Sequence, residues 1–223
     1  MCFSAPASFV SATVLTAIDI FCLQHLRKKD KKYVLFALIP LFFGIQQFIE
    51  GCVWLVVKGG HESMLRILAY LYLFFAFSFW PVFIPLAVLI AKPREKRITK
   101  ILLLTMLLSG IIVATWSYIP LLLETTIFHV KVINFSIAYF TNRSPFLDNL
   151  FLFLYLFAIV PPFLIVSDIK MKLFGALMLV SVCTTYVFYR YAFCSVWCFF
   201  GAILSLYIAY MMYHLPHLAP KKE

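Results

Sequence analysis

The residues best suited to chemistry lie in one apolar stretch, residues 33–57, which is long enough to cross a bilayer. This stretch carries Gln46, Gln47, Glu50 and Trp54. On a helix, Gln46, Glu50 and Trp54 share one face because they are four residues apart, and Gln47 borders that face. A carboxyl group inside a membrane span is costly and usually faces the bundle interior or a water-filled cavity. The stretch therefore predicts a polar site within the membrane, with Glu50 at its centre.

Two interpretations of this site are open. In the first, Glu50 is the charged centre of an outward-facing pocket whose aromatic walls bind an organic cation by charge and cation–π attraction. In the second, Glu50 is neutral, or is paired with Arg190 or backbone donors, and holds helices together as a polar clasp. The candidate ligand-binding residues are Gln46, Gln47, Glu50, Trp54, Trp80, Arg190 and Trp197.

The composition is that of a membrane protein. The chain has 223 residues, of which 64% are hydrophobic and only 13% are charged, and a soluble domain of this size does not need so much apolar surface. The formal net charge is +10, but the basic residues lie in short segments between apolar spans. That distribution is typical of a membrane topology signal and not of a phosphate-binding surface. We therefore expect no nucleic-acid partner.

We expect an all-α fold, a single domain of residues 1–223 with seven transmembrane helices. Each apolar segment has about the 17–25 residues that a helical span needs, or slightly more. The expected spans are residues 9–26, 33–57, 64–91, 98–122, 147–166, 173–191 and 195–213.

The orientation follows from the distribution of Lys and Arg between the two sides of the membrane. One side holds fourteen of them, namely Arg27, Lys28, Lys29, Lys31, Lys32, Lys92, Arg94, Lys96, Arg97, Lys100, Lys170, Lys172, Lys221 and Lys222. The other side holds five, namely Lys58, Arg66, Lys131, Arg143 and Arg190. Basic residues concentrate on the cytoplasmic side, so we expect the N-terminus outside and the C-terminus in the cytoplasm.

The connection at residues 124–146 is the longest and lies on the expected outer side. Its centre is rich in β-branched and aromatic residues, which favours a short hairpin or an interfacial segment lying on the bundle. A connection of this length is either a lid over a site or a plain cap.

Other groups were weighed as metal or proton sites. Asp19, in the middle of the first span, is either a proton-relay group or the partner of another polar side chain. Cys194 and Cys198 are one turn apart and could bind a metal or meet Cys2 or Cys52 in a disulfide, but their spacing is not that of a zinc finger. We expect no metal and no cofactor.

Several stretches together resemble an uncharacterised bacterial membrane-protein family whose members open with MCFSA-x-ASF and carry GxQQxxEGxxW. The matching stretches are residues 1–9, 40–54, the Trp80-Pro81 pair with Pro85, and residues 136–139, 161–168 and 195–205. Asp19 departs from this pattern, which would have an apolar or small residue there. The resemblance implies the multi-pass architecture and carries no established activity.

The function expected from these features is the binding or transport of a small molecule or lipid group at an outward-facing pocket around Glu50. The alternative is a membrane-embedded enzyme, hydrolase-like, with Glu50 as acid or base or with a metal held by His25, His214 and His217. A structural or sensory partner protein is a third hypothesis. The expected partners are membrane lipids and a small organic cation or lipid, and the expected location is the inner membrane of a bacterium.

Overall fold

The computed structural model describes residues 4–26, 31–57, 59, 61–123, 128–141 and 145–215. Cys2, Arg143 and His217 lie outside these ranges, as does the side chain of Cys194. The expectations that involve those groups are therefore not compared with the structure.

Within the described residues, seven helical segments are long and apolar enough to cross a membrane, as the hydropathy predicts. They are Ala5–Leu26, Lys31–Val56, Glu62–Ala91, Arg97–Leu122, Phe146–Ile165, Ile169–Ala192 and Ser195–Tyr213. The predicted all-α fold with seven transmembrane helices is thus confirmed, with boundaries that differ by only a few residues. The bundle exposes large apolar side chains such as Val14, Leu108 and Val187, which suits contact with lipid.

Several spans are interrupted helices. The first is α1 (Ala5–Leu26), and the second joins η1 (Lys31–Tyr33), α2 (Val34–Ala37) and α3 (Ile39–Val56). The third joins α4 (Glu62–Leu73), the π-helical η2 (Phe74–Phe79) and α5 (Trp80–Ala91), and the fourth is α6 (Arg97–Leu122). The fifth joins α7 (Pro145–Ile159) and α8 (Pro161–Ile165), the sixth joins α9 (Ile169–Tyr189) and η3 (Arg190–Ala192), and the seventh is α10 (Phe193–Tyr213).

Proline explains two of the interruptions. Pro161 and Pro162 begin α8 after α7 ends at Ile159, because proline clashes with a preceding helical turn and lacks an N–H donor. Pro81 follows the π-helical segment, where the N–H of Trp80 donates to the carbonyl of Phe75, five residues back. Such π segments occur frequently at functional sites.

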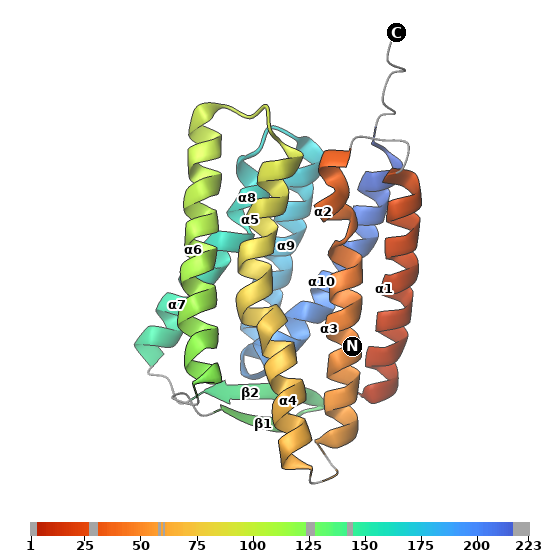
Figure 1. Cartoon of the computed structure of the whole chain (residues 1–223), viewed down its shortest axis with the longest axis vertical. Helices are drawn as coiled ribbons and strands as arrows, with labels where there is room; N and C mark the ends of the chain where they lie inside the picture. Colours follow the sequence, from red (N-terminus) through yellow and green to blue (C-terminus); the bar gives the residue numbers. More distant parts are fainter. Residues whose placement is uncertain are drawn as a thin grey trace.

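A β-hairpin covers one end of the bundle, which we call the hairpin end (Figure 1). Strands β1 (Phe128–Ile133) and β2 (Ser136–Thr141) pair antiparallel, with Ile133 opposite Ser136. The two turn residues Asn134 and Phe135 have φ of 46° and 57°, as a type I′ turn requires. The hairpin lies on the bundle through buried side chains, and the ring of Tyr139 stacks on Tyr72 with centroids 4.9 Å apart.

Two glycines allow the helices of the core to approach closely. A Cβ added to Gly110 of α6 would lie 1.9 Å from the carbonyl oxygen of Pro81 in α5. A Cβ added to Gly201 of α10 would lie 2.4 Å from the ring of Phe43 in α3. Small residues at helix contacts are the usual means of close packing in membranes. Here Gly110 leaves room for the backbone of α5, and Gly201 leaves room for the aromatic ring of Phe43.

At the opposite end, which we call the loop end, an ion pair joins two connections. Lys92 Nζ donates to Asp168 Oδ2 at 2.5 Å and to the hydroxyl of Tyr33 at 3.1 Å. Burial by itself raises the pKa of Asp168, but the hydrogen bond and charge of Lys92 outweigh it and hold that pKa below its ordinary value. Burial lowers the pKa of Lys92, yet the bonds to Asp168 and Tyr33 hold it above its ordinary value.

Asp168 also begins a helix. Its Oδ1 accepts from the backbone N–H groups of Lys170 at 2.9 Å and Met171 at 3.4 Å, which makes it the N-cap of α9. One carboxylate therefore fixes both the start of the sixth span and the contact with the connection after the third.

Candidate functional site

Glu50 of α3 is fully buried and lies against the start of α10. Ser195 Oγ donates to Glu50 Oε1 at 2.5 Å, and Gln47 Nε2 donates to Glu50 Oε2 at 3.3 Å. All three side chains have no exposed surface. Both carboxyl oxygens thus accept hydrogen bonds from inside the bundle, where an unpaired acceptor would be costly.

Gln46, one helical turn before Glu50, connects three helices. Its Oε1 accepts from the indole Nε1 of Trp80 at 2.7 Å, and its Nε2 donates to Cys198 Sγ at 3.1 Å. Trp80 lies on α5 and Cys198 on α10, so the amide joins α3 to both. The ring of Phe43 stacks on Trp80 with centroids 4.0 Å apart, which fixes the indole from its other side.

These hydrogen bonds form one buried polar cluster, made of Gln46, Gln47, Glu50, Trp80, Ser195 and Cys198. Gln46 and Glu50 lie one turn apart on α3, and Cys198 and Ser195 lie one turn apart on α10. Two side-chain bridges therefore form side by side, one from Gln46 to Cys198 and one from Glu50 to Ser195. Because Glu50 is closed off from solvent and bonded on both oxygens, this geometry favours the clasp interpretation over a solvated pocket around Glu50.

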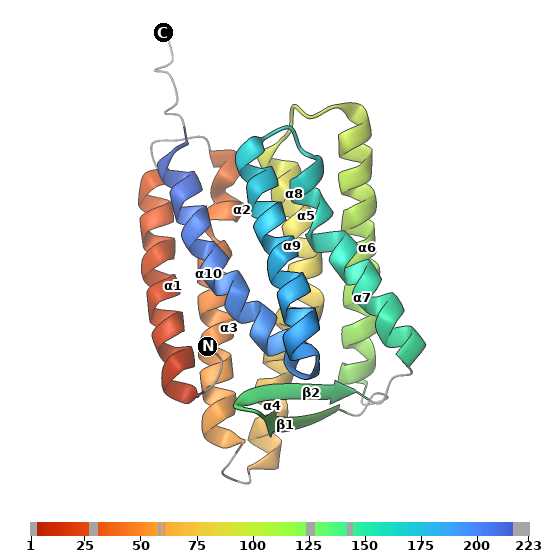
Figure 2. The ribbon, with the colours of Figure 1, turned by 180° about the vertical axis from the view of Figure 1, so that it is seen from behind.

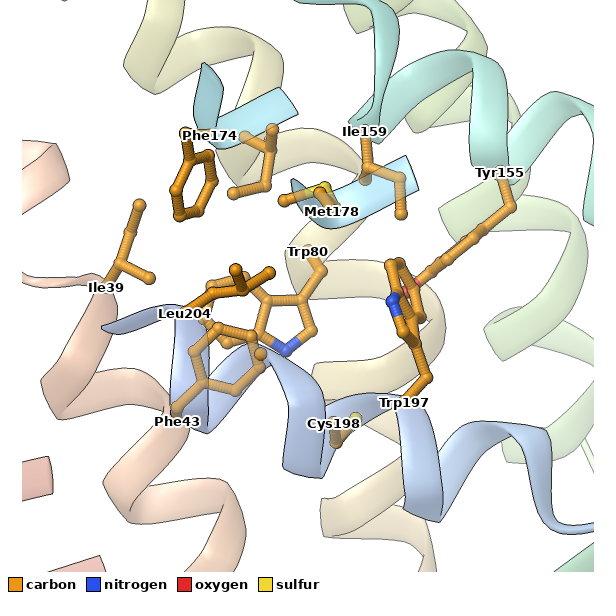
Figure 3. A pocket seen from close by; sticks show the side chains of 12 residues that line it. Ile39, Phe43, Trp80, Tyr155, Ile159, Phe174, Met178, Trp197, Cys198 and Leu204 are labelled. Atoms are coloured by element: carbon orange, nitrogen blue, oxygen red, sulfur yellow. The ribbon is translucent and has the colours of Figure 1, made fainter. Parts of the chain in front are cut away.

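Beside the cluster lies a small apolar cavity of about 30 Å³, which we call the inner cavity (Figure 3). Side chains of five helices surround it, and Trp80, Cys198 and Trp197 form its wall next to the cluster. Phe174, Met178 and Ile159 close its opposite side in Figure 3. Glu50 does not line this cavity.

A much larger cavity of about 310 Å³, the hairpin cavity, lies between β2, α7 and η3 at the hairpin end. Its wall contains Asp148 and Asn149 at the start of α7, Arg190 of η3, and tyrosines from three elements, Tyr139, Tyr186 and Tyr191. Asp148, Asn149 and Arg190 are exposed, so the cavity opens to the surface. The guanidinium carbon of Arg190 lies 5.1 Å from the centroid of the Tyr186 ring, a cation–π contact that positions the charge.

A third cavity of about 50 Å³, the middle cavity, lies between these two. It shares Phe77, Phe151, Leu152 and Phe193 with the hairpin cavity. It shares Tyr155, Trp197 and Cys198 with the inner cavity.

The chain belongs to the family of unknown function DUF6629. The family model matches residues 1–221, which is nearly the whole chain. No curated protein and no solved structure matches the chain significantly. Membership of DUF6629 agrees with the resemblance to an uncharacterised family and assigns no activity to the chain.

The structure separates the seven residues that sequence reasoning grouped into one site. Gln46, Gln47, Glu50 and Trp80 meet in the buried polar cluster. Trp54 is also buried, but it packs with Val53 and Ile137 beneath the hairpin.

The other two residues of that group line cavities. Arg190 is exposed and lines the hairpin cavity. Trp197 stands between the middle and inner cavities and donates its indole N–H to Ser181 Oγ at 3.2 Å.

Ser195, Asp148 and Asn149 are not among the site residues predicted from the sequence. Nothing local in the sequence marks Ser195 and Cys198 as partners of Glu50 and Gln46, because they come from a different helix 145 and 152 positions away. Asp148 could have been noticed as the carboxylate in the first turn of the fifth span.

Within the described residues, no group of three or more His, Cys, Asp or Glu side chains gathers as metal ligands would. His25 and His214 both lie beside the ring of Tyr213 at the loop end. Each has Nδ1 within 3.0 Å of a backbone carbonyl oxygen of its own helix. The metal-enzyme hypothesis therefore gains no geometric support from these histidines.

Asp19 is buried in α1, with 3% of its surface exposed. Its Oδ1 has no hydrogen-bond partner within the described part of the chain. Cys22, three residues further along α1, is also buried.

Proposed function

We propose that the protein is an integral membrane protein that binds a lipid headgroup, or a small molecule of the same chemistry, in the hairpin cavity. The ligand carries an anionic phosphate that contacts Arg190 and an ammonium group that contacts Asp148. The observation that carries the proposal is the presence of these opposite charges in the wall of one open cavity of about 310 Å³.

The chemistry of the wall supports a zwitterionic ligand. A guanidinium presents a planar fork of donors that matches phosphate oxygens. An ammonium is attracted both by a carboxylate and by the faces of aromatic rings such as Tyr186 and Tyr191. The proposal retains the cation recognition expected from the sequence, but it transfers the carboxylate role from Glu50 to Asp148.

The position of the cavity also suits a lipid headgroup. It lies where α7 begins and α9 ends, at one end of the membrane-spanning segments, which is the depth of headgroups in a bilayer. From the distribution of basic residues we propose that this end faces outward from a bacterial cytoplasmic membrane. The buried polar cluster does not line this cavity and serves to hold α3, α5 and α10 together.

The test is to measure, by calorimetry, the binding of water-soluble phosphocholine to the full chain in detergent. We expect Arg190→Gln and Asp148→Asn each to weaken binding about tenfold or more, because each removes a charge-assisted contact. Lys131→Gln is the matched control, since Lys131 is an exposed cation on the hairpin that does not line the cavity. Equal affinity in all four proteins, or no binding to any, would refute the proposal.

A further inference from the structure

We infer that the ligand of the hairpin cavity carries a single alkyl chain, and that this chain runs inward through the middle cavity to the inner cavity beside Trp80. This inference rests on the proposed function for the headgroup and adds the class of the whole molecule, a single-chain phospholipid. The hairpin cavity shares wall residues with the middle cavity, and the middle cavity shares wall residues with the inner cavity.

The first step of the path leads from the headgroup site to the middle cavity, which adjoins it. Phe77, Phe151, Leu152 and Phe193 line both the hairpin cavity and the middle cavity, so one layer of side chains separates the two spaces. The rings of Phe77 and Phe151 meet edge to face, with centroids 5.4 Å apart. This layer is entirely apolar, which suits an alkyl chain and excludes a second charged group.

The second step passes Trp197. Its indole is held by Ser181 and packs edge to face on Tyr155, with centroids 5.6 Å apart. Trp197, Tyr155 and Cys198 line both the middle and the inner cavity. The inner two cavities are small, about 50 and 30 Å³, so these aromatic rings must rotate when a chain enters.

The path ends among apolar side chains and is long enough for an alkyl chain. The inner cavity ends against residues such as Phe174 and Met178, which offer nothing to a polar chain terminus. Along α7 the lining residues extend from Asp148 to Ile159, a rise of about 16 Å along the helix axis. A single chain of medium length therefore fits the path, with its methyl end beside Trp80.

The arrangement of the helices allows a lipid to enter from the side. Figure 2 shows α7 diverging from α9 toward the hairpin end, with β2 crossing below the gap. In the structure α7 packs against α5 and α6, whereas α9 packs against α10 and α8. The hairpin cavity occupies the space where the two helices part.

The experiment uses a single-chain phosphocholine lipid with a photoreactive diazirine at its chain end, bound to the full chain in nanodiscs. After illumination and proteolysis, we expect labelled peptides containing Trp80, Met178 or Cys198. Affinity should rise with chain length in a series of short, medium and long chains. Labels confined to lipid-facing residues such as Val14 and Leu108, or affinity independent of chain length, would overturn the inference.

Two variants separate this inference from the proposed function. Leu204→Trp places a large ring in the wall of the inner cavity, and Leu204 does not line the headgroup site. It should abolish labelling beside Trp80 and the gain in affinity from the longest chains, while phosphocholine binding stays unchanged. Leu206→Trp is the matched control, because Leu206 is 58% exposed on the same helix. Inner labelling without phosphocholine binding would refute the headgroup proposal alone. Phosphocholine binding without inner labelling in the unmodified protein would refute the chain path alone.

Discussion

Ser195 Oγ lies 2.5 Å from Glu50 Oε1, although the two residues are 145 positions apart in the chain. The contact joins the seventh span to the second at the level where the polar cluster crosses the bundle. Together with the bond from Gln47 it supplies a donor to each oxygen of a completely buried carboxyl group. The carboxyl group that looks most reactive in the sequence is therefore a structural junction in this conformation.

Glu50→Leu should destabilise the protein by about 1–3 kcal/mol or more, because Ser195 and Gln47 would lose their common acceptor in a buried site. Glu50→Gln should cost much less, since the new side chain keeps an oxygen for Ser195 and the amide of Gln47 can turn to accept from the new NH₂ group. Thermal unfolding in detergent measures both. Equal losses for the two variants would contradict the clasp, as would loss of phosphocholine binding in a stably folded Glu50→Gln protein.

The ion pair at the loop end should give the protein a predictable pH dependence. The pKa of Asp168 is depressed, so its stabilisation is fully present above the ordinary carboxyl pKa of about 3.9 and is lost as the pH falls through the lower folded value. The pKa of Lys92 is raised, so its stabilisation is present below about 10.4 and is lost as the pH rises through the higher folded value. The contribution of this ion pair to stability should therefore be constant between these two limits.

Asp168→Asn should remove the charge of the pair while an amide oxygen still caps α9, at a cost of about 1–2 kcal/mol because the pair is partly exposed. Asp168→Ala should cost about 1 kcal/mol more, since it also removes the cap. Unfolding measured from acid to alkaline pH should show a smaller pH dependence in both variants. If the stability of the Asp168→Asn protein falls with acid as that of the unmodified protein does, the role of the Lys92–Asp168 ion pair in acid stability is contradicted.

Gly110→Ala should destabilise the protein by about 1–3 kcal/mol or more, because the new methyl group would collide with the Pro81 carbonyl. The sign of the change in stability is diagnostic, because in a helix without such a neighbour alanine is about 1 kcal/mol more favourable than glycine. Leu108→Ala, on the same helix but 57% exposed, is the control and should have a small effect. A stabilised Gly110→Ala protein would show that α5 and α6 are not in close contact.

The membrane orientation predicts opposite labelling of two engineered cysteines, each compared with the labelling of the unmodified chain and its six native cysteines. Asn134→Cys, at the hairpin turn, should react with an impermeant maleimide on intact cells. Arg94→Cys, at the loop end, should react only after the membrane is opened. The reason is the excess of Lys and Arg on the loop-end side. The reverse pattern at both positions would invert the proposed topology and turn the hairpin cavity toward the cytoplasm.

The sequence by itself determined the membrane-spanning segments and the residues of the site that share one face of the second span. Hydropathy over about twenty residues decides whether a helix can cross a bilayer, which is a local property. The four-residue spacing of Gln46 and Glu50 likewise places them on one helical face without any knowledge of the fold. Neither conclusion depends on which helix packs beside α3.

The tertiary structure alone decided what those residues face. Ser195 and Cys198 come from α10, 145 and 152 positions away, and only helix packing selects them as partners of Glu50 and Gln46. The same packing separates Arg190 from the cluster and brings it to one cavity with Asp148. Cavities arise where packed helices diverge, as α7 does from α9, and hydrophobic periodicity specifies which face of a helix is buried but not its neighbour or its tilt.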